Sequence, residues 1–389
     1  MAMLPAHVRQ ISLAKGVQAS VATLRQRITF RPLVYGYSNA RVRAMHAAFV
    51  GKELLREMLA ARSVNEGIEL LERTAYKEDI VPLSLKYKGE ELVELALAAN
   101  FAKFAQKLKK STPKPGKKAV EAMLSRWDVR NIKTVMLGRK LGKKFEDISA
   151  LLVPAGSLAP DELAQMAGAK DGLELFSCIR GSSFGRRMFE APIPNAPALS
   201  GMRKAMLSQD EKTTELISTL LDGYYFHLTK DAVVPSDFDS MAVRRMLASE
   251  ADGKNLSTVL RLRNSGAGAQ AVRGMLVPGG FVKVQEFASM LDGGQFDARL
   301  AHVAGVLGIR KEIADYQAAK SISALEMALE KKAALESLHA MRRLQMGLGT
   351  IVGALLLKEQ EISNIRKIIR GKALGLPHER IEQMLVIVE

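Results

Sequence analysis

The sequence predicts an all-α protein built from three similar helical lobes, and two observations carry this prediction: the composition and an internal repeat. Good helix formers such as Ala, Leu, Met, Glu, Lys and Arg are plentiful, aromatic residues make up only 5 % of the chain, and alternating apolar and polar runs are rare. The chain has 389 residues, of which 48 % are hydrophobic, so it is long enough for two or three units that each bury a core.

The repeat is marked by an asparagine inside a helical pattern. Asn131, Asn255 and Asn364 each begin the outline Asn, apolar, polar, polar, apolar, apolar. In the first two copies a Leu-Val-Pro segment begins 21 residues after the asparagine, and a short segment that runs from Glu to Met begins 31 residues after it. Identical spacing of three separate signals indicates an internal duplication.

The third copy is predicted to be shorter than the other two. Pro377 follows its asparagine by 13 residues, whereas Pro154 and Pro278 follow theirs by 23. We therefore expect a deletion of ten residues in a surface connection, where deletions are best tolerated. On this alignment one asparagine and one proline form the structural motif of each copy: Asn131 with Pro154, Asn255 with Pro278, and Asn364 with Pro377.

Each copy begins with a long helical pattern that precedes the asparagine-bearing helix. These first helices are expected at residues 90–110, 211–230 and 321–344. In the asparagine-bearing helices apolar residues recur at steps of three, four and seven, which places them on one face that a neighbour must cover. The predicted division is a basic extension at 1–34, a helical segment at 35–81, and lobes at 82–205, 206–310 and 311–389, with a proline-rich linker at 191–197.

Both chain ends have features of their own. The extension resembles a targeting segment in composition, and a frayed basic tail or a start codon assigned too early is the alternative.

Residues 35–81 contain a faint fourth match to the repeat, in which the segment that ends at Met58 echoes the short Glu-to-Met segment. Because the third copy lacks its tail after Met384, we expect residues 35–81 to pack beside the C-terminal lobe and close a ring. An open rod with the two termini at opposite ends would contradict this expectation.

No pattern in the chain is typical of an enzyme site. The six histidines are too far apart to share a helical face, and the glycine-containing loops at 138–144 and 266–271 each follow a helix rather than a strand. Cys178, the only cysteine, has no paired histidine pattern and indicates a reducing, cytoplasmic setting. We therefore expect no catalytic residue, no metal ligand and no cofactor.

The formal net charge of +16 favours anionic partners. Charge alone leaves nucleic acid, anionic membrane surfaces and acidic proteins open, although no named nucleic-acid motif occurs. The longest apolar run, residues 348–357, has ten residues against the roughly 20 that a membrane-spanning helix needs, so we expect a buried helix there.

Basic residues follow the motif of each copy and are candidates for a partner interface. They are Arg139 and Lys140, Arg261 and Arg263, and Arg370 and Lys372. The alternative is that they only interact with the C-terminal ends of helices. For the three asparagines, a repeated structural hydrogen bond is favoured over ligand binding, because an amide buried between helices can satisfy a backbone group at an equivalent point in each lobe.

Three segments together resemble one known family. They are YGYSNARVRAM at residues 35–45, WDVRNIK at 127–133 and EISNIRKIIRG at 361–371. From about residue 35 to residue 389 the chain resembles the C subunit of archaeal-type (A/V-type) rotary ATPases, a family related to the d subunit of the vacuolar ATPase. The resemblance implies an all-helical funnel of three lobes with pseudo-threefold symmetry and no active site.

The resemblance also implies a role. Proteins of this family are peripheral to the membrane, have no transmembrane segment, and lie on the cytoplasmic face of the rotor ring of proteolipid subunits. They receive the central shaft in a socket, couple the rotation of the shaft to that of the ring, and bind no nucleic acid. An unrelated helical-repeat scaffold and a basic nucleic-acid-binding protein are the alternatives. ATP synthesis versus hydrolysis, and proton versus sodium transport, depend on other subunits.

Overall fold

The computed structural model describes residues 31–190, 211–234, 238–264, 266, 268, 272–292, 294–343 and 347–388. Every regular element within these residues is a helix, which confirms the all-α prediction. Residues 1–30 of the predicted basic extension and the predicted linker at 191–197 lie outside the described residues.

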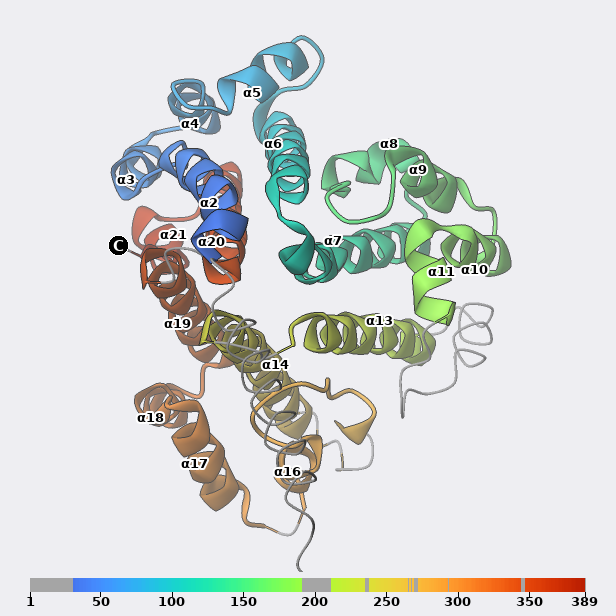
Figure 1. Cartoon of the computed structure of the whole chain (residues 1–389), viewed down its shortest axis with the longest axis vertical. Coiled ribbons are helices and arrows are strands. Elements are labelled where there is room, and N and C mark those ends of the chain that lie inside the picture. Colours follow the sequence, from blue (N-terminus) through green and yellow to red (C-terminus); the bar gives the residue numbers. More distant parts are fainter. Residues whose placement is uncertain are drawn as a thin grey trace, which may run out of the picture.

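Three helical hairpins occupy the centre of the described structure (Figure 1). They are α6 (Gly89–Ser111) with α7 (Lys114–Lys140), α13 (Glu211–Ala232) with α14 (Phe238–Asn264), and α19 (Ile322–Arg343) with α20 (Leu348–Ala373). The first helix of each hairpin begins and ends within two residues of its predicted bounds. In the first hairpin Pro113 and Pro115 interrupt the helical pattern, because proline is accommodated at the start of a helix but not in its interior.

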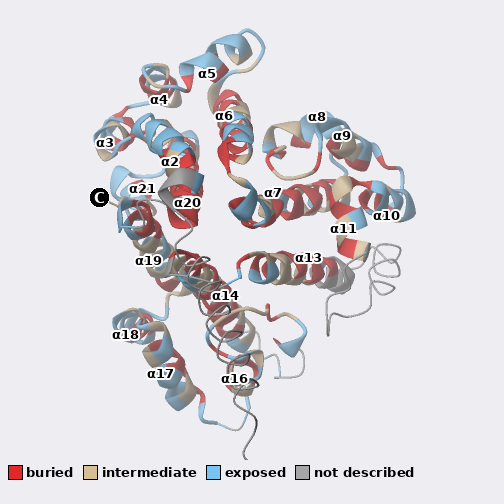
Figure 2. Cartoon of the chain, in the orientation of Figure 1, coloured by how far each residue is buried: buried red, intermediate tan, exposed pale blue. Residues whose placement is uncertain are grey.

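Shorter helices lie around the hairpins, and they expose their outer faces while the long helices hold most of the buried residues (Figure 2). The N-terminal group is α2 (Arg31–Ala47), α3 (Lys52–Ala60), α4 (Val64–Leu71) and α5 (Lys77–Ser84). The first hairpin is followed by α8 (Phe145–Ile148), η1 (Ser149–Leu151), α9 (Pro160–Gly168), α10 (Gly172–Gly181) and α11 (Ser183–Glu190). The later helices are α16 (Val284–Ser289), α17 (Phe296–Leu307), α18 (Arg310–Ala319) and α21 (His378–Glu382).

The hairpins pack on one another in a repeated way. The first helix of one hairpin lies against the second helix of the preceding one: α13 packs on α7, and α19 packs on α14. The same relation also joins the first hairpin to the last, because α6 packs on α20. Apolar residues fill these contacts, and in α20 the side chains of Ile351, Val352 and Leu355 are buried, which confirms that the run at 348–357 is a core helix.

None of the described helices is both long enough and apolar enough to span a bilayer.

The N-terminal helices pack against the C-terminal end of the chain. Helices α2, α3 and α4 all contact α20, and α3 also contacts α21. Apolar residues from both ends, such as Met58 and Ile80 with Ile365 and Ile368, belong to one buried cluster. Segments from opposite ends of the sequence therefore share a single core.

Candidate functional site: the repeat asparagines and a central polar cavity

Each of the three asparagines holds the backbone of a residue 22 positions later. The Asn131 side chain accepts a hydrogen bond from the Val153 N–H at 2.9 Å and donates one to the Val153 carbonyl at 2.8 Å. Asn255 makes the same two bonds to Val277, and Asn364 makes them to Val386. All three amides are buried. Each therefore satisfies a buried backbone donor and acceptor in a segment that has no regular structure of its own.

The third copy keeps the full spacing, so the expected ten-residue deletion is wrong. Since Asn364 bonds to Val386, the counterpart of Val153 and Val277 lies beyond Pro377, and Pro377 is not the equivalent of Pro154 and Pro278. Pro377 instead precedes α21, which begins 14 residues after its asparagine, as α8 does in the first copy. The prediction used proline as the marker, whereas the hydrogen bonds need only a backbone N–H and C=O.

The asparagine-bearing helices end at equivalent positions. Eleven residues after each asparagine stands a glycine with positive φ: Gly142 at +64°, Gly266 at +73° and Gly375 at +66°. This left-handed conformation favours glycine and ends a helix. In the first and third copies the next N–H reaches back to the carbonyl five residues earlier, and both bonds measure 2.8 Å.

The chain itself uses most of the candidate interface cations. Arg261 pairs with Glu326, Arg263 lies 3.9 Å from Asp297, Arg370 pairs with Glu90 and Glu94, and Lys372 donates to the carbonyls of Leu59 and Ala61. Lys140 also has a partner within the chain. Among the described residues Arg139 has no ion pair or side-chain hydrogen bond, so of the six it is the cation most available to a partner. A partner interface at these positions stays a prediction.

A buried acid lies three residues before each asparagine. Asp128 accepts hydrogen bonds from the N–H groups of Ser157 and Leu158, and Asp252 accepts them from Phe281 and Val282. Each acid thereby fixes the loop that leads into the next short helix of its own copy, α9 or α16.

In the third copy the corresponding acid is Glu361, and its backbone donor comes from the other end of the sequence. Its Oε2 accepts the N–H of Val50 at 2.9 Å. Helix α3 begins two residues after Val50, as α9 begins two residues after Leu158, and both helices have nine residues. Ser63 then caps α4 as Asp171 caps α10, each accepting from the N–H of a glutamate three residues on. Helices α3 and α4 therefore take the positions in the third copy that α9 and α10 take in the first.

Asn255→Ala is expected to lower the free energy of unfolding by about 2–3 kcal/mol, because the fully buried N–H and C=O of Val277 both lose their partner. Urea unfolding measures this loss. The exposed Asn264→Ala is the control and should change stability by less than about 0.5 kcal/mol. Partner binding by the folded fraction should not change, and a selective loss of binding at wild-type stability would contradict the structural role.

Asp252 is expected to make the stability of the chain depend on pH. Burial raises its pKa from 3.8 to about 6, against the opposing effect of the hydrogen bonds from Phe281 and Val282. Between these values the folded chain binds more protons than the unfolded chain, so this carboxyl makes folding less favourable as the pH rises from about 4 to 6. Asp252→Asn should remove that loss. The free energy of unfolding of wild type minus that of Asp252→Asn should fall by on the order of 2 kcal/mol from pH 4 to pH 7. If the free energies of unfolding of the two proteins change in parallel with pH, the assignment is contradicted.

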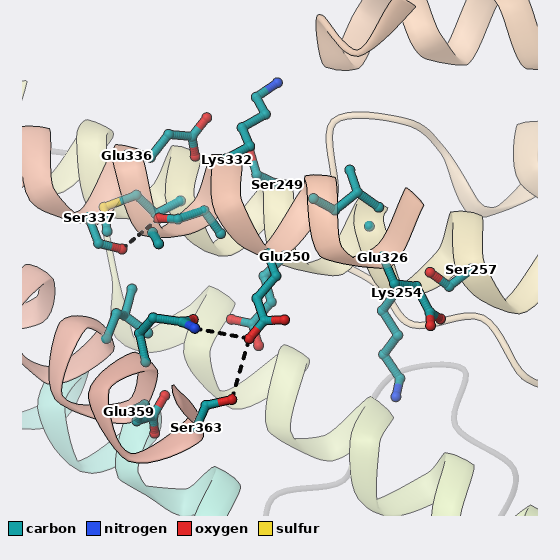
Figure 3. Close-up of a pocket in the computed structure, with 18 of the residues that line it drawn as sticks. Ser249, Glu250, Lys254, Ser257, Glu326, Lys332, Glu336, Ser337, Glu359 and Ser363 are labelled. Atoms are coloured by element: carbon teal, nitrogen blue, oxygen red, sulfur yellow. Dashed lines mark hydrogen bonds between the residues drawn. The ribbon is translucent and has the colours of Figure 1, made fainter. Parts of the chain in front are cut away.

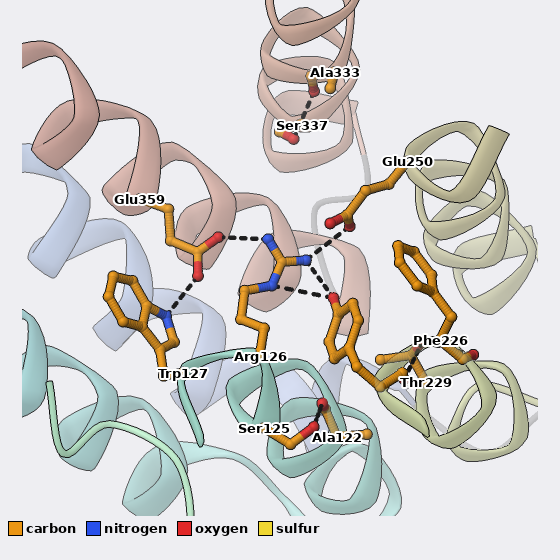
Figure 4. Close-up of polar contacts among 11 residues, drawn as sticks. Ala122, Ser125, Arg126, Trp127, Phe226, Thr229, Glu250, Ala333, Ser337 and Glu359 are labelled. Atoms are coloured by element: carbon orange, nitrogen blue, oxygen red, sulfur yellow. Dashed lines mark hydrogen bonds and ion pairs between the residues drawn. The ribbon is translucent and has the colours of Figure 1, made fainter. Parts of the chain in front are cut away.

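A polar cavity of about 780 Å³ lies where α7, α14, α19 and α20 meet (Figure 3). At one side of it the residues five positions before the three asparagines come together: Arg126, Glu250 and Glu359 (Figure 4). The Arg126 guanidinium lies 2.7 Å from Glu250 and 2.8 Å from Glu359, and it also donates to the hydroxyl of Tyr225. One equivalent position from each copy thus meets its counterparts in a single ion network.

Most charged groups that line the cavity have partners. Glu359 also accepts the indole N–H of Trp127 at 2.7 Å, Lys254 pairs with Asp222, and Lys332 donates to the carbonyl of Leu307. Burial raises the pKa of Glu336, one carboxylate oxygen of which has no hydrogen-bond partner. No group of three or more His, Cys, Asp or Glu side chains that could hold a metal occurs in the described part of the chain.

Comparison with known proteins identifies the family. The ATP synthase (C/AC39) subunit family matches residues 38–384. The chain belongs to this family. Its relatives include proteins that are named as the C subunit of A-type ATP synthase. The one from Methanocaldococcus jannaschii is 25 % identical over 358 residues, which cover 90 % of this chain and 86 % of the relative. The one from Methanosphaera stadtmanae is 26 % identical over 386 residues, which cover 97 % of this chain and 95 % of the relative. The one from Desulfurococcus sp. strain SY is 27 % identical over 365 residues, which cover 92 % of this chain and 92 % of the relative.

Family membership confirms the resemblance that the three sequence segments indicated. Sequence reasoning nevertheless missed the buried acids and the ion network of this family member. The acids had a visible signal, since Asp128, Asp252 and Glu361 all stand three residues before an asparagine. The network had none, because equivalent positions in the three copies carry opposite charges and a search for similar residues cannot align Arg126 with two glutamates.

Proposed function

We propose that this chain is a non-catalytic central-stalk subunit of a rotary A-type ATP synthase, a socket that couples the rotating shaft to the membrane rotor ring. Family membership and the names of the relatives support this role. On this proposal the chain is peripheral and lies on the cytoplasmic face of the membrane, with the shaft subunits and the proteolipid ring as its partners.

The observation that carries the proposal is the meeting of three equivalent positions beside the central cavity. Arg126, Glu250 and Glu359 come from three hairpins that pack on one another in a cycle. Such an arrangement is what a pseudo-threefold funnel requires, with lobes near 82–205, 206–310 and 311–389 and with residues 35–81 completing the third lobe. A torque adaptor needs a stiff body, and long helices tied by buried ion pairs supply one.

A basic surface at the first hairpin turn supports a ring-facing side. Five exposed lysines surround the α6–α7 turn: Lys107, Lys110, Lys114, Lys117 and Lys118. None has an ion pair with any residue that the structure describes. The cavity begins about three helical turns further along α7, so the two surfaces are separate. We propose that the cavity receives the shaft and that this turn, together with Arg139, faces the ring and its anionic surroundings.

Binding of the purified shaft subunit to the full chain tests the socket. We expect wild type to form a complex with the shaft subunit at roughly physiological salt. Ser257 and Ser363 line the cavity, so Ser257→Trp and Ser363→Trp should each block it and prevent binding. Ser177→Trp, on the exposed face of α10, is the control. Absence of a complex with wild type would refute the proposal, and steeply salt-dependent binding to DNA in its place would favour the nucleic-acid alternative.

Reconstitution with the membrane ring tests the basic surface. Exchanging Lys114, Lys117 and Lys118 for glutamine should weaken attachment to the ring and leave shaft binding intact. The matched control removes the same charge from α5 and the turn after it, at Lys77, Lys86 and Lys88, which are also exposed. Equal weakening by both triple variants would mean that net charge alone acts.

A further inference from the structure

Arg130 is the one cavity-lining cation to which the described residues give no ion pair or hydrogen bond. The other lining cations are Arg126, Lys254, Arg261, Lys332 and Arg366, and each bonds to a carboxylate or a carbonyl. The Arg130 guanidinium lies over the ring of Trp127, whose centroid is 4.7 Å away. Its five N–H donors therefore have no acceptor among the described residues.

Arg130 stands at the cavity among groups of both charges. Its side chain is exposed to the cavity, yet burial by the surrounding protein lowers its pKa. Glu359 and Glu250 act in the opposite direction and raise that pKa, whereas Arg126 and Arg366 lower it. All four groups already have partners, since Arg126 pairs with both glutamates and Arg366 pairs with Glu94. An exposed guanidinium that lines the cavity and has no acceptor among the described residues is open to an anion that a partner brings.

The charges around the cavity and the shape of the guanidinium indicate the class of ligand. Six lining cations face five lining carboxylates: Glu250, Glu326, Glu330, Glu336 and Glu359. Two of the cations pair with carboxylates outside the lining, Lys254 with Asp222 and Arg366 with Glu94. A monoanionic carboxylate on Arg130 meets less repulsion from the lining carboxylates than a dianionic phosphate does. A carboxylate also matches the planar fork of a guanidinium, to which it binds through two parallel hydrogen bonds.

We propose that Arg130 binds a carboxylate, either an acidic side chain or the C-terminal carboxylate, on the segment of the shaft subunit that enters the cavity. This inference rests on the proposed function and deepens it. The stack on Trp127 orients the guanidinium before binding, so the ion pair forms with little loss of side-chain freedom.

The dissociation constant of the shaft complex tests the assignment. Arg130→Gln should weaken binding about 30-fold, and Arg130→Lys should recover part of the loss because lysine keeps the charge but not the fork. Arg73→Gln, which removes an exposed arginine far from the cavity lining, should leave affinity unchanged. Urea unfolding of Arg130→Gln should match wild type, because no intramolecular ion pair is lost.

A charge exchange identifies the partner group. Arg130→Glu should abolish binding, and arginine in place of one acidic residue in the inserted shaft segment should restore it. If wild type binds the shaft and Arg130→Gln binds it equally well, the inference is overturned while the socket stands. If wild type does not bind, the socket itself fails. If Arg130→Gln no longer binds inorganic phosphate, which wild type binds, but still binds the shaft subunit as wild type does, the ligand of Arg130 is a small oxyanion and the inference is also overturned.

Discussion

Arg126→Leu is expected to lower the free energy of unfolding by about 3–5 kcal/mol, because it leaves two carboxylates of a buried network without their counterion. The side chains of Arg126 and Glu359 are only 12 % and 11 % exposed, whereas Glu250 is 35 % exposed. Most of the loss should therefore arise at Glu359. Urea unfolding at neutral pH measures it.

Removing the whole network is the control for this prediction. The triple variant Arg126→Leu, Glu250→Gln, Glu359→Gln has no unpaired charge and should regain more than half of the stability lost, since apolar or neutral replacement of a buried ion network is often nearly neutral. Arg56→Leu breaks an exposed pair with Glu53 and should cost about 1 kcal/mol or less. If Arg126→Leu costs no more than Arg56→Leu, the network does not hold the hairpins together.

Glu361→Ala is expected to separate the N-terminal helices from the C-terminal hairpin, again at a cost of about 3–5 kcal/mol. The variant leaves Lys358, whose side chain is only 5 % exposed, without its ion pair. It also removes the acceptor of the Val50 N–H and of the Tyr76 hydroxyl, which bonds to Glu361 at 2.6 Å. Amide hydrogen exchange should therefore accelerate in residues 50–76 before it does in α13 or α14.

Two further variants separate charge from hydrogen bonding at Glu361. Glu361→Gln keeps an acceptor for Val50 but removes the charge that Lys358 needs, so its loss of stability should be intermediate. Adding Lys358→Met to Glu361→Ala removes the unpaired cation and should restore part of the stability. Wild-type protection of residues 50–76 in Glu361→Ala would show that apolar packing alone attaches these helices.

The sequence predicted the hairpins well because the signals for them are local. Apolar periodicity and the proline-rich turn at 113–115 act within one segment, and the predicted first helices differ from α6, α13 and α19 by at most two residues at either end. The third copy was misaligned because a proline, not the backbone pair held by each asparagine, was used to define the turn. The Leu-Val pair at 385–386, at the spacing found in the other copies, would have corrected it.

By itself the sequence determined that this protein is all-helical, that one helical unit recurs, and to which family the chain is similar. These properties depend on residue type and short-range spacing. The tertiary structure decided that an acid near the C-terminus fixes a loop near the N-terminus, across 311 residues of sequence. It also decided that an arginine and two glutamates from equivalent positions form one ion network. The reason is physical: such contacts form only once distant helices are packed, and nothing in the local pattern of either partner specifies the other.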